Sequence, residues 1–290
     1  MNCFRISRSS MMAHLAAVFV LASATVAPSA TISFTGLSGT DWNTASNWNS
    51  AVPGSGDLAR VFGPGAIAEV SAGSASASYI DVRQDGTLNV TGGNLTFGYA
   101  NNRWLWVGWQ TPGTVNQSGG VVGTFGSNVD VIVDNFGTYN LTGGTLDISD
   151  DLRLEGNAVF NISGDSTVNI GDDLRVANGS NVEFNVQLIG DEAPAINVSD
   201  DLVLRNTTTL NIDSTNWTGG SAITLFDAGD RVVGEFASVT LDGVSVPASQ
   251  YQFSSGSVII SVPESSSMPL AAWFLVGLPF ARLANRERTC

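Results

Sequence analysis

Lysine is absent from this sequence of 290 residues, while cysteine occurs twice and histidine once. These few residues, Cys3, His14 and Cys290, lie close to the two ends, so residues 31–263 contain no Lys, His or Cys. That segment has no disulfide framework and offers only oxygen ligands to a metal ion, which excludes structural zinc. Hydrolysis by a Ser-His-Asp or Cys-His arrangement is nearly excluded as well, because the segment has neither His nor Lys to act as the base.

Positive charge is also scarce. Residues 31–263 contain seven Arg and twenty-four Asp or Glu, which gives a formal charge of 7 − 24 = −17. An acidic surface repels the phosphates of nucleic acids, whose binding needs clustered Lys and Arg, so we expect no nucleic-acid partner. Acidity can accompany disorder, but 43% of the residues are hydrophobic and recur in short regular runs, which predicts a packed core.

The first 30 residues have the pattern of a signal peptide. Arg5 and Arg8 form a basic start, residues 15–24 form a short apolar core, and small residues around Ala24 and Ala30 offer cleavage sites. The apolar core is shorter than the roughly 20 residues that span a bilayer. We therefore expect the export machinery to translocate the chain and signal peptidase to remove residues 1–30.

Residues 263–290 have the pattern of a second processing signal. Pro263-Glu264-Ser265 precedes an apolar run over residues 268–281, and three arginines follow it, Arg282, Arg286 and Arg288. An apolar run of this length is also compatible with a buried helix. Its position at the extreme end, before a basic cluster, favours a sorting tail, which would be the chain's only contact with a membrane.

Two triplets alternate along the middle of the sequence. The first is apolar-Asn-apolar, with Gln in the third place of one copy, and occurs as Leu88-Asn89-Val90, Val115-Asn116-Gln117, Tyr139-Asn140-Leu141, Phe160-Asn161-Ile162, Phe184-Asn185-Val186 and Leu210-Asn211-Ile212. Its Asn residues are 27, 24, 21, 24 and 26 positions apart, and three copies continue into a Gly-Gly pair, which bends the chain sharply. The second triplet occurs as Leu105-Trp106-Val107, Val131-Ile132-Val133, Leu152-Arg153-Leu154, Leu174-Arg175-Val176 and Leu202-Val203-Leu204. Each repeat therefore contains at least two short strands.

These triplets predict an all-β fold, a parallel β-helix or solenoid. Neighbouring side chains of a strand point to opposite faces, so the outer residues of each triplet face a core and the middle residue faces solvent. One repeat is too small to bury its apolar face alone, so successive repeats must stack in parallel, with right-handed turns expected. A β-sandwich has similar strand spacing, but repetition of residue identity favours the solenoid. The Asn side chains either form ladders or simply tolerate solvent beside a turn.

Five segments follow from these patterns. The signal peptide (1–30) precedes an N-terminal cap (31–60), in which Trp42 and Trp48 lie among turn-forming residues. The solenoid repeats occupy residues 61–215. Residues 216–262 lack the Asn triplet, and their alternating segments predict antiparallel strands of a C-terminal β cap, over 222–227, 234–241 and 251–262. The sorting tail (263–290) completes the chain.

Several motifs together carry a resemblance to a known family. They are Asp41-Trp42-Asn43, Asn47-Trp48, Val52-Pro53-Gly54-Ser55-Gly56-Asp57, the two Gly-Thr-x-Asn repeats that begin at Gly86 and Gly113, and Val262-Pro263-Glu264. With them, the chain resembles the PEP-CTERM sorting-domain proteins with autotransporter-like β-strand repeats, surface proteins common in planctomycetes. The resemblance implies an exported protein of the bacterial cell envelope, surface or extracellular matrix, linked to exopolysaccharide. It also implies cleavage near Pro263 and Glu264 by an exosortase-like sorting enzyme, although the family's tail begins Pro-Glu-Pro and this chain has Ser265 in the third place.

Acidic pairs recur before the second triplet, as Asp150-Asp151, Asp172-Asp173 and Asp200-Asp201. Stacked on neighbouring coils, they would bring several carboxylates together, and carboxylate oxygens are ligands that calcium prefers. Alternatively, Asp favours turns and merely precedes each strand. Calcium is therefore the one cofactor that the sequence leaves open.

Three tryptophans, Trp104, Trp106 and Trp109, follow one another within a single segment. If Leu105 faces inward, Trp104 and Trp106 lie outside, and flat sugar faces pack well on indole rings. These residues are the candidate platform for envelope or matrix polysaccharide. The alternative is that the rings pack under a loop of the N-terminal cap.

Two functions from different classes remain. The first is a non-catalytic structural or adhesive surface solenoid, associated with exopolysaccharide or calcium. The second is a polysaccharide lyase or glycoside hydrolase of the pectin-lyase-like β-helix type, since carboxylate-only chemistry needs two Asp or Glu. The sequence contains no unique, non-repeating carboxylate cluster, which favours the first function.

Overall fold

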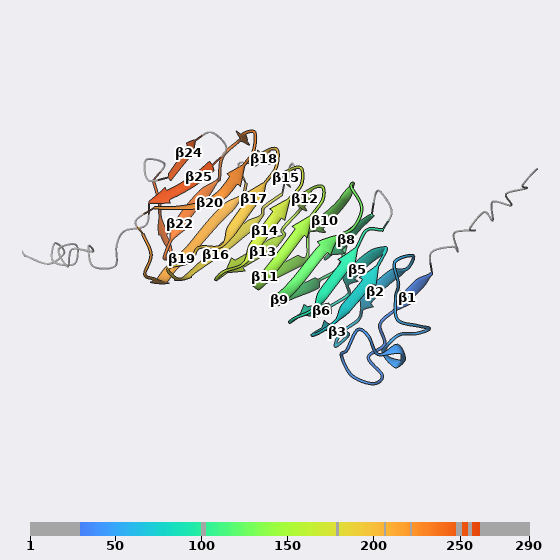
Figure 1. The fold of residues 1–290 in the computed structure, drawn as a ribbon. Helices are drawn as coiled ribbons and strands as arrows, with labels where there is room; N and C mark the ends of the chain where they lie inside the picture. The colour runs from blue at the N-terminus through green and yellow to red at the C-terminus, as the bar shows by residue number, and fades with distance from the viewer. Residues whose placement is uncertain are drawn as a thin grey trace, which may run out of the picture.

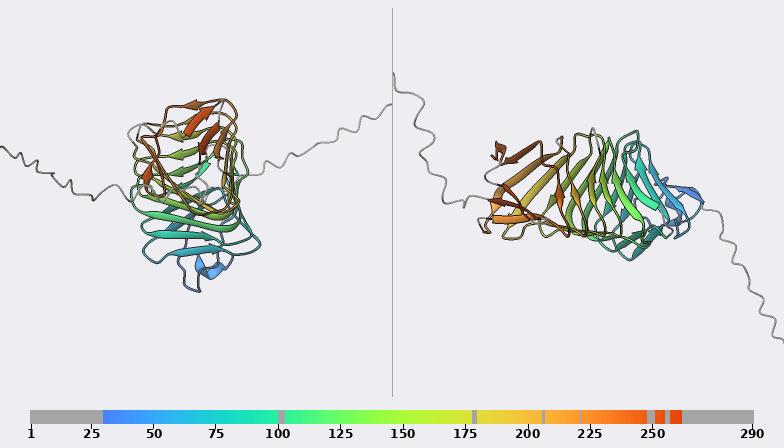
Figure 2. Two further views of the ribbon diagram at one scale, coloured as in Figure 1. Left: turned by 90° about the vertical axis from the view of Figure 1, so that its left-hand side faces the viewer. Right: turned by 90° about the horizontal axis from the view of Figure 1, so that it is seen from above.

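The computed structural model describes residues 30–99, 103–177, 180–205, 207–220, 222–247, 251–254 and 257–261. This part of the chain is nearly all β and contains one short 3-10 helix, η1 (Ala45–Asn47). Parallel strands stack as a β-solenoid of about eight turns, which confirms the predicted fold class (Figure 1). The two further views in Figure 2 show the coils following one another along a single rod.

Two sheets form the wall of the rod. The first sheet contains nine strands in parallel, namely β1 (Thr31–Ser33), β2 (Leu58–Phe62), β5 (Tyr79–Arg83), β8 (Arg103–Val107), β10 (Val129–Val133), β12 (Leu152–Leu154), β15 (Leu174–Val176), β18 (Leu202–Val203) and β21 (Val232–Val233). Five of its members, β8, β10, β12, β15 and β18, carry the second triplet of the sequence repeat. Leu105, Val131, Leu152, Leu174 and Leu202 stand in one register along this sheet.

The second sheet has sixteen strands in two branches. One branch carries the Asn triplet and contains β3 (Ile67–Val70), β6 (Gly86–Val90), β9 (Gly113–Thr124), β11 (Gly137–Ile148), β13 (Val159–Ser163), β16 (Glu183–Gly190), β19 (Thr209–Trp217), β22 (Ser238–Leu241) and β23 (Val244–Ser245). The other branch contains β4 (Ser74–Ala77), β7 (Asn94–Phe97), β14 (Thr167–Ile170), β17 (Ala195–Val198), β20 (Ala222–Ala228), β25 (Ser257–Ser261) and β24 (Tyr251–Ser254).

Most coils therefore contain three strand segments, one more than the triplets specified. β9 and β11 are long enough to serve both branches, because residues 113–117 of β9 pair with β6 and residues 121–124 pair with β7. The bend between these halves lies at Gly119-Gly120, where Gly120 has a φ of +69°, a conformation that glycine adopts without strain. The Gly-Gly pairs thus mark a corner of the coil.

The six repeated asparagines stack directly on one another. Their side chains form a ladder in which each Nδ2 donates to the Oδ1 of the preceding Asn, at 2.9, 2.7, 2.5, 2.7 and 2.9 Å from Asn116 to Asn211. The ladder is therefore real, and the alternative that Asn merely tolerates solvent is wrong. The same contact recurs in the other branch, where Asn197 donates to Asn169 at 2.9 Å.

The interior of the rod is filled by the outer residues of both triplets. Leu88, Leu105 and Leu141 are fully buried, and burial of each such side chain stabilises the fold by about 1.5–3 kcal/mol. Aromatic rings also stack along the axis: Tyr139 and Phe160 have centroids 5.6 Å apart, and Phe160 and Phe184 are 5.8 Å apart. Side chains of like size at corresponding positions thus keep the coils in register.

Residues 34–57 fold over the first coil. Trp42 is fully buried and Trp48 nearly so, and their rings meet edge to face at 4.7 Å. The indole Nε1 of Trp48 donates to the carbonyl oxygen of Trp42 at 2.7 Å. Backbone hydrogen bonds from Trp42 to Glu69 and from Glu69 to Thr40 pair this segment with the edge of β3. The open edge of the sheet is covered there.

Parallel stacking continues beyond residue 215, where the sequence predicted its end. β20 pairs in parallel with β17, β21 with β18, and β22 with β19. Among the described strands, the antiparallel pairs are β20–β25, β24–β25 and β22–β23. The predicted boundary at 215 is thus too early, because the Asn signature ends while the apolar alternation that drives stacking persists.

Candidate functional site

The outer face of the first sheet carries both groups of predicted site residues. Leu105 and Val107 are fully buried, and alternation along β8 places Trp104 and Trp106 on the outer side, each half-buried. The same alternation puts Arg153 of β12 and Arg175 of β15 outward. The Asp pairs directly precede these strands, so the tryptophans and the Asp pairs lie on successive coils of the first sheet.

The aromatic part of this face is a continuous set of ring contacts. Trp104 meets Tyr79 edge to face at 5.2 Å and Trp106 at 5.8 Å, and Trp106 stacks on Trp109 at 4.8 Å. The Nε1 of Trp106 donates to Oδ2 of Asp134 at 3.1 Å. The three predicted tryptophans are thus brought together, and their contacts are with one another and with the strands on either side.

A buried ion pair supports the aromatic rings from the preceding coil. Asp81 is only 2% exposed and lies opposite Trp106 in the register of β5 and β8. Its Oδ2 is 3.3 Å from Nε of Arg83, whose guanidinium lies 4.6 Å from the ring centroid of Trp109. Burial raises the pKa of Asp81 to about 6. No pattern in the sequence marks Asp81, Arg83 or Tyr79, because they become neighbours of the tryptophans only through coil stacking.

A cavity of about 310 Å³ lies where the aromatic part meets the acidic part. Its lining residues are Trp104, Trp106, Asn128, Asp130, Ile132, Asp150, Arg153 and Glu155. Arg153 contacts Glu155 at 2.7 Å and Asp130 at 3.7 Å. Burial and the neighbouring Asp150 raise the pKa of Asp130. The cavity therefore combines two indole rings with three carboxyl groups, a guanidinium and an amide.

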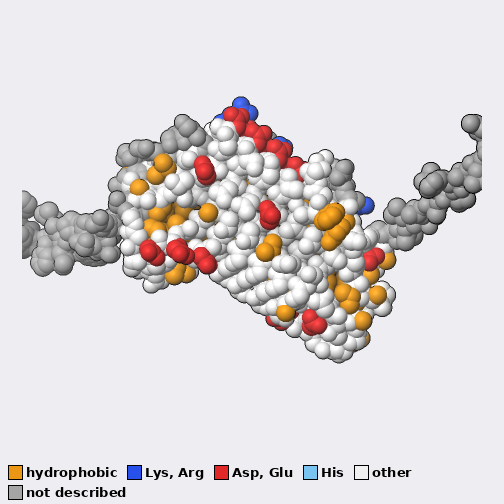
Figure 3. Space-filling view, viewed as in Figure 1, with side chains coloured by type: hydrophobic (Ala, Val, Ile, Leu, Met, Phe, Trp, Pro, Cys, Tyr) orange, Lys and Arg blue, Asp and Glu red, His pale blue; other side chains and the backbone are white. Residues whose placement is uncertain are grey.

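The acidic part of the face is a stack of the predicted Asp pairs. Figure 3 shows acidic side chains in a line along the edge of the rod over β12, β15 and β18, with basic side chains at its end. One carboxylate oxygen from each of three residues lies within 4.8 Å of the others in three successive groups: Asp150, Asp151 and Asp172; Asp172, Asp173 and Asp200; Asp200, Asp201 and Asp230. All six predicted residues are brought together, and Asp230 joins them.

The second Asp of each pair already has partners. The backbone N–H of Asp173 donates to Asp151 at 3.2 Å, and that of Asp201 donates to Asp173 at 2.8 Å. Arg175 forms ion pairs with Asp151 at 3.3 Å and with Asp173 at 2.5 Å. The second Asp of each pair therefore ties neighbouring coils together at the start of the strands of the first sheet.

The first Asp of each pair is more open to solvent and is the group that could offer oxygen to a cation. Asp200 and Asp230 are exposed, and Asp150 and Asp172 are half-buried. Three carboxylate oxygens supply only part of the six to eight ligands that calcium takes, so waters or a ligand would have to complete its shell. Asp230 does not fit the pattern of Asp pairs, because Arg231 stands where the pattern has a second Asp. Arg231 forms two hydrogen bonds to Oδ2 of Asp201, at 3.0 and 2.8 Å.

The predicted processing residues lie at the margins of the structure. Ala24, Pro263 and Glu264 are outside the described residues. Ala30 is exposed, and its carbonyl accepts a hydrogen bond from the backbone N–H of Leu58 at 2.8 Å. Within the described ranges, no helix is long and apolar enough to cross a membrane. The apolar run over 268–281 lies outside those ranges.

Comparison with protein-family models, with curated proteins and with solved structures finds no match to this chain.

Proposed function

We propose that this chain is an exported, non-catalytic bacterial β-solenoid that binds polysaccharide on the outer face of its first sheet. The observation that carries the proposal is the cavity in which Trp104 and Trp106 adjoin three carboxyl groups and Arg153. Indole rings pack against the flat faces of sugars, and charged or amide groups beside them orient hydroxyls by hydrogen bonding. A rigid rod that presents such a face suits a structural or adhesive role.

The binding test compares two tryptophan variants with a matched aromatic control. We expect Trp104→Ala and Trp106→Ala each to weaken binding to polysaccharide extracted from the native envelope or matrix by about tenfold, measured by titration calorimetry. Phe125→Ala is the control, because Phe125 is 68% exposed and stacks on Tyr99 rather than on the tryptophans. Binding that survives both tryptophan substitutions unchanged would overturn the proposal.

The location is proposed on the resemblance to PEP-CTERM proteins and on the two terminal patterns. The chain would meet the export machinery, signal peptidase and an exosortase-like enzyme in turn, and would reside in the cell envelope, surface or matrix. The intact mass of the protein released from its native cells tests this order. Loss of residues 1–30 and of the segment after Glu264 supports it, and a full-length mass contradicts it.

An enzyme of the pectin-lyase-like type is the alternative function. The proximity of Asp130 and Asp150, which raises the pKa of Asp130, is the observation in its favour. The acidic residues, however, recur on successive coils and do not form one unique pair, which favours the non-catalytic function. Product release from acidic polysaccharides, screened with and without calcium, would establish the enzyme and refute the non-catalytic proposal.

A further inference from the structure

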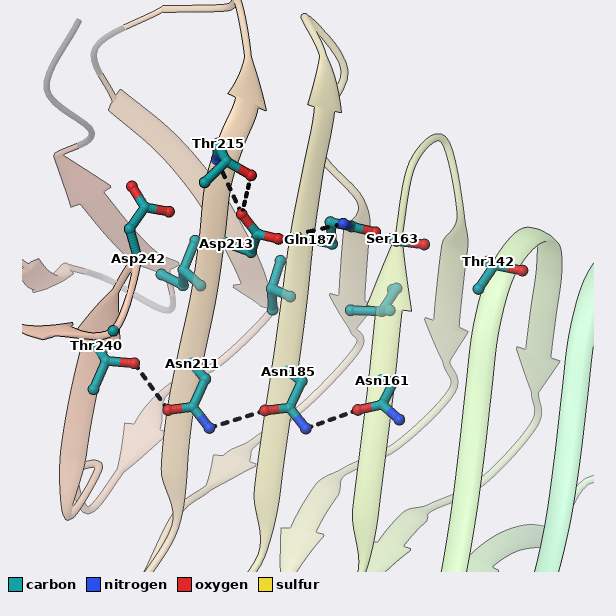
Figure 4. Close-up of a pocket in the computed structure, with 14 residues that line it drawn as sticks. Thr142, Asn161, Ser163, Asn185, Gln187, Asn211, Asp213, Thr215, Thr240 and Asp242 are labelled. Atoms are coloured by element: carbon teal, nitrogen blue, oxygen red, sulfur yellow. Dashed lines mark hydrogen bonds between the residues drawn. The ribbon is translucent and has the colours of Figure 1, made fainter. Parts of the chain in front are cut away.

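A second groove lies on the outer side of the Asn-bearing branch, near the C-terminal end of the rod (Figure 4). Its volume is about 670 Å³, roughly twice that of the cavity beside the tryptophans. It crosses β13, β16, β19 and β22, a span of about 15 Å at the usual strand spacing. Its lining residues include Asn161, Asn185, Gln187, Asn211, Asp213 and Asp242.

The asparagine ladder provides one side of this groove. Asn185 donates one N–H to Asn161 and accepts one from Asn211, as the dashed lines of Figure 4 show. A side-chain amide has two donor hydrogens and two acceptor lone pairs, so each internal ladder residue keeps one of each for a ligand. This side of the groove therefore offers donors and acceptors repeated at the strand spacing, and apolar side chains, Ile162, Val186 and Ile212, are also among the lining residues.

Two carboxylates held in fixed positions, Asp213 and Asp242, line the groove opposite the ladder (Figure 4). Thr215 donates to Asp213 from its hydroxyl at 2.6 Å and from its backbone N–H at 3.0 Å, and Gln187 donates to it at 3.3 Å. The bonds from Thr215 keep the pKa of Asp213 below its usual value, so this carboxyl is ionised at neutral pH. Asp242 is held by two bonds of 2.7 Å from Ser214.

The charge of the lining selects among ligands. The described lining residues include two carboxylates and no basic side chain, so an anionic chain such as a polyuronate or a phosphate polymer is repelled. A hydroxyl both donates and accepts, and matches an amide that has one of each left. We propose that this groove is a second binding site, which takes a neutral linear oligosaccharide lying along the rod. It is distinct from the tryptophan face and does not depend on it.

The test uses the full chain with Trp104 and Trp106 both replaced by Ala, so that the first site contributes no stacking. The probe is a soluble neutral β-glucan tetrasaccharide, and the comparison ligand is an oligogalacturonide of equal length. We expect the neutral probe to bind and the acidic one to bind at least about tenfold more weakly, measured by titration calorimetry.

Further variants, made in the chain that has Trp104 and Trp106 replaced by Ala, distinguish the loss of a contact in the groove from damage to the asparagine ladder. Thr240 already donates its hydroxyl to Asn211 at 2.9 Å, so threonine fits a ladder position. Asn185→Thr therefore keeps the ladder while removing the free amide N–H, and we expect it to weaken binding about tenfold, as should Gln187→Ala. Asn116→Thr makes the same change in the same ladder outside the groove and should leave binding unchanged.

The outcomes of these measurements are distinct. Loss on Asn185→Thr without loss on Asn116→Thr supports the groove. Equal binding by all variants, equal binding of the acidic probe, or no binding of the neutral probe overturns it. None of these results bears on the tryptophan face, whose variants are tested separately in the unmodified chain.

Discussion

The glycine that begins β6, β9 and β11 shows how a single missing atom sets the packing between coils. A Cβ built on Gly113 would lie 2.1 Å from the carbonyl oxygen of Val82 on the preceding coil, and one on Gly86 would lie 2.1 Å from that of Val61. Real Cβ atoms do not approach an oxygen so closely. The carbonyl oxygen belongs to the backbone of a paired strand and cannot move away. In these coils, the glycine of the Gly-Thr-x-Asn repeat is therefore a requirement of coil-to-coil contact.

Gly113→Ala should lower the free energy of unfolding by about 3 kcal/mol, because the added methyl group must displace backbone from a close-packed wall. Chemical denaturation measures this change. Gly56→Ala is the control, since a Cβ there meets nothing within 4 Å. Similar effects of the two substitutions would show that the close approach of Gly113 to Val82 does not limit packing.

Buried carboxyl groups make the stability of the rod depend on pH. Burial raises the pKa of both Asp81 and Asp151 to about 6 from an ordinary value of 3.8. A carboxyl with a raised pKa holds more protons in the folded than in the unfolded chain, so stability falls as pH rises from about 4 to about 6. The excess of acidic over basic residues acts in the same direction, because deprotonation adds like charges.

The melting temperature should therefore be higher near pH 5 than near pH 7.5, within the range where the chain stays soluble. Asp151→Asn should narrow that difference, because the amide oxygen can still accept the N–H of Asp173 without titrating. Asp191→Asn, at an exposed loop position, should leave it unchanged. A melting temperature that rises with pH across this interval would contradict the assignment.

At the scale of single elements, the asparagine ladder ties neighbouring strands together. Asn140 bonds to a ladder residue on each side, to Asn116 at 2.7 Å and to Asn161 at 2.5 Å. Asn89 begins the ladder and bonds only to Asn116 within it, at 2.9 Å. The sequence repeat predicted that these residues would stack, and left open whether they would bond.

Replacement at these two positions should differ in cost by about the value of one hydrogen bond. We expect Asn140→Ala to lower the free energy of unfolding by about 2 kcal/mol and Asn89→Ala by about 1 kcal/mol. A double-mutant cycle between Asn116 and Asn140 should give a coupling energy of about 0.5–1.5 kcal/mol. Additive effects would show that water replaces the ladder bond at no cost.

At the scale of the whole molecule, the rod behaves as a row of coils that each contact only their neighbours. In such an arrangement, a terminal coil has one stabilising interface and an internal coil has two. Amides of β9, β11 and β14 should therefore exchange with solvent most slowly, and those of β1 and β24 fastest, as native-state hydrogen exchange with mass spectrometry can measure. Uniform protection along the chain would indicate a single cooperative unit without weak ends.

Much of this architecture follows from residue order alone. The regular return of Asn, Gly and paired apolar residues specifies stacked parallel coils, because identical residues in register bury like against like and satisfy one another's hydrogen bonds. The outward position of Trp104 and Trp106 follows from strand alternation. The grouping of the Asp pairs follows from their recurrence before each strand of the first sheet.

Only the tertiary structure decided the rest, because those features depend on which residues of one coil meet which residues of the next. The third strand segment of each coil, as in Leu95-Thr96-Phe97, has no middle residue common to all copies, and the coils after 215 stack on apolar alternation without Asn. Asp81 lies opposite Trp106, and Asp130 and Asp150 line one cavity, across 20 or more residues of sequence. The second groove likewise forms between rows of side chains from four strands, so no local pattern could predict it.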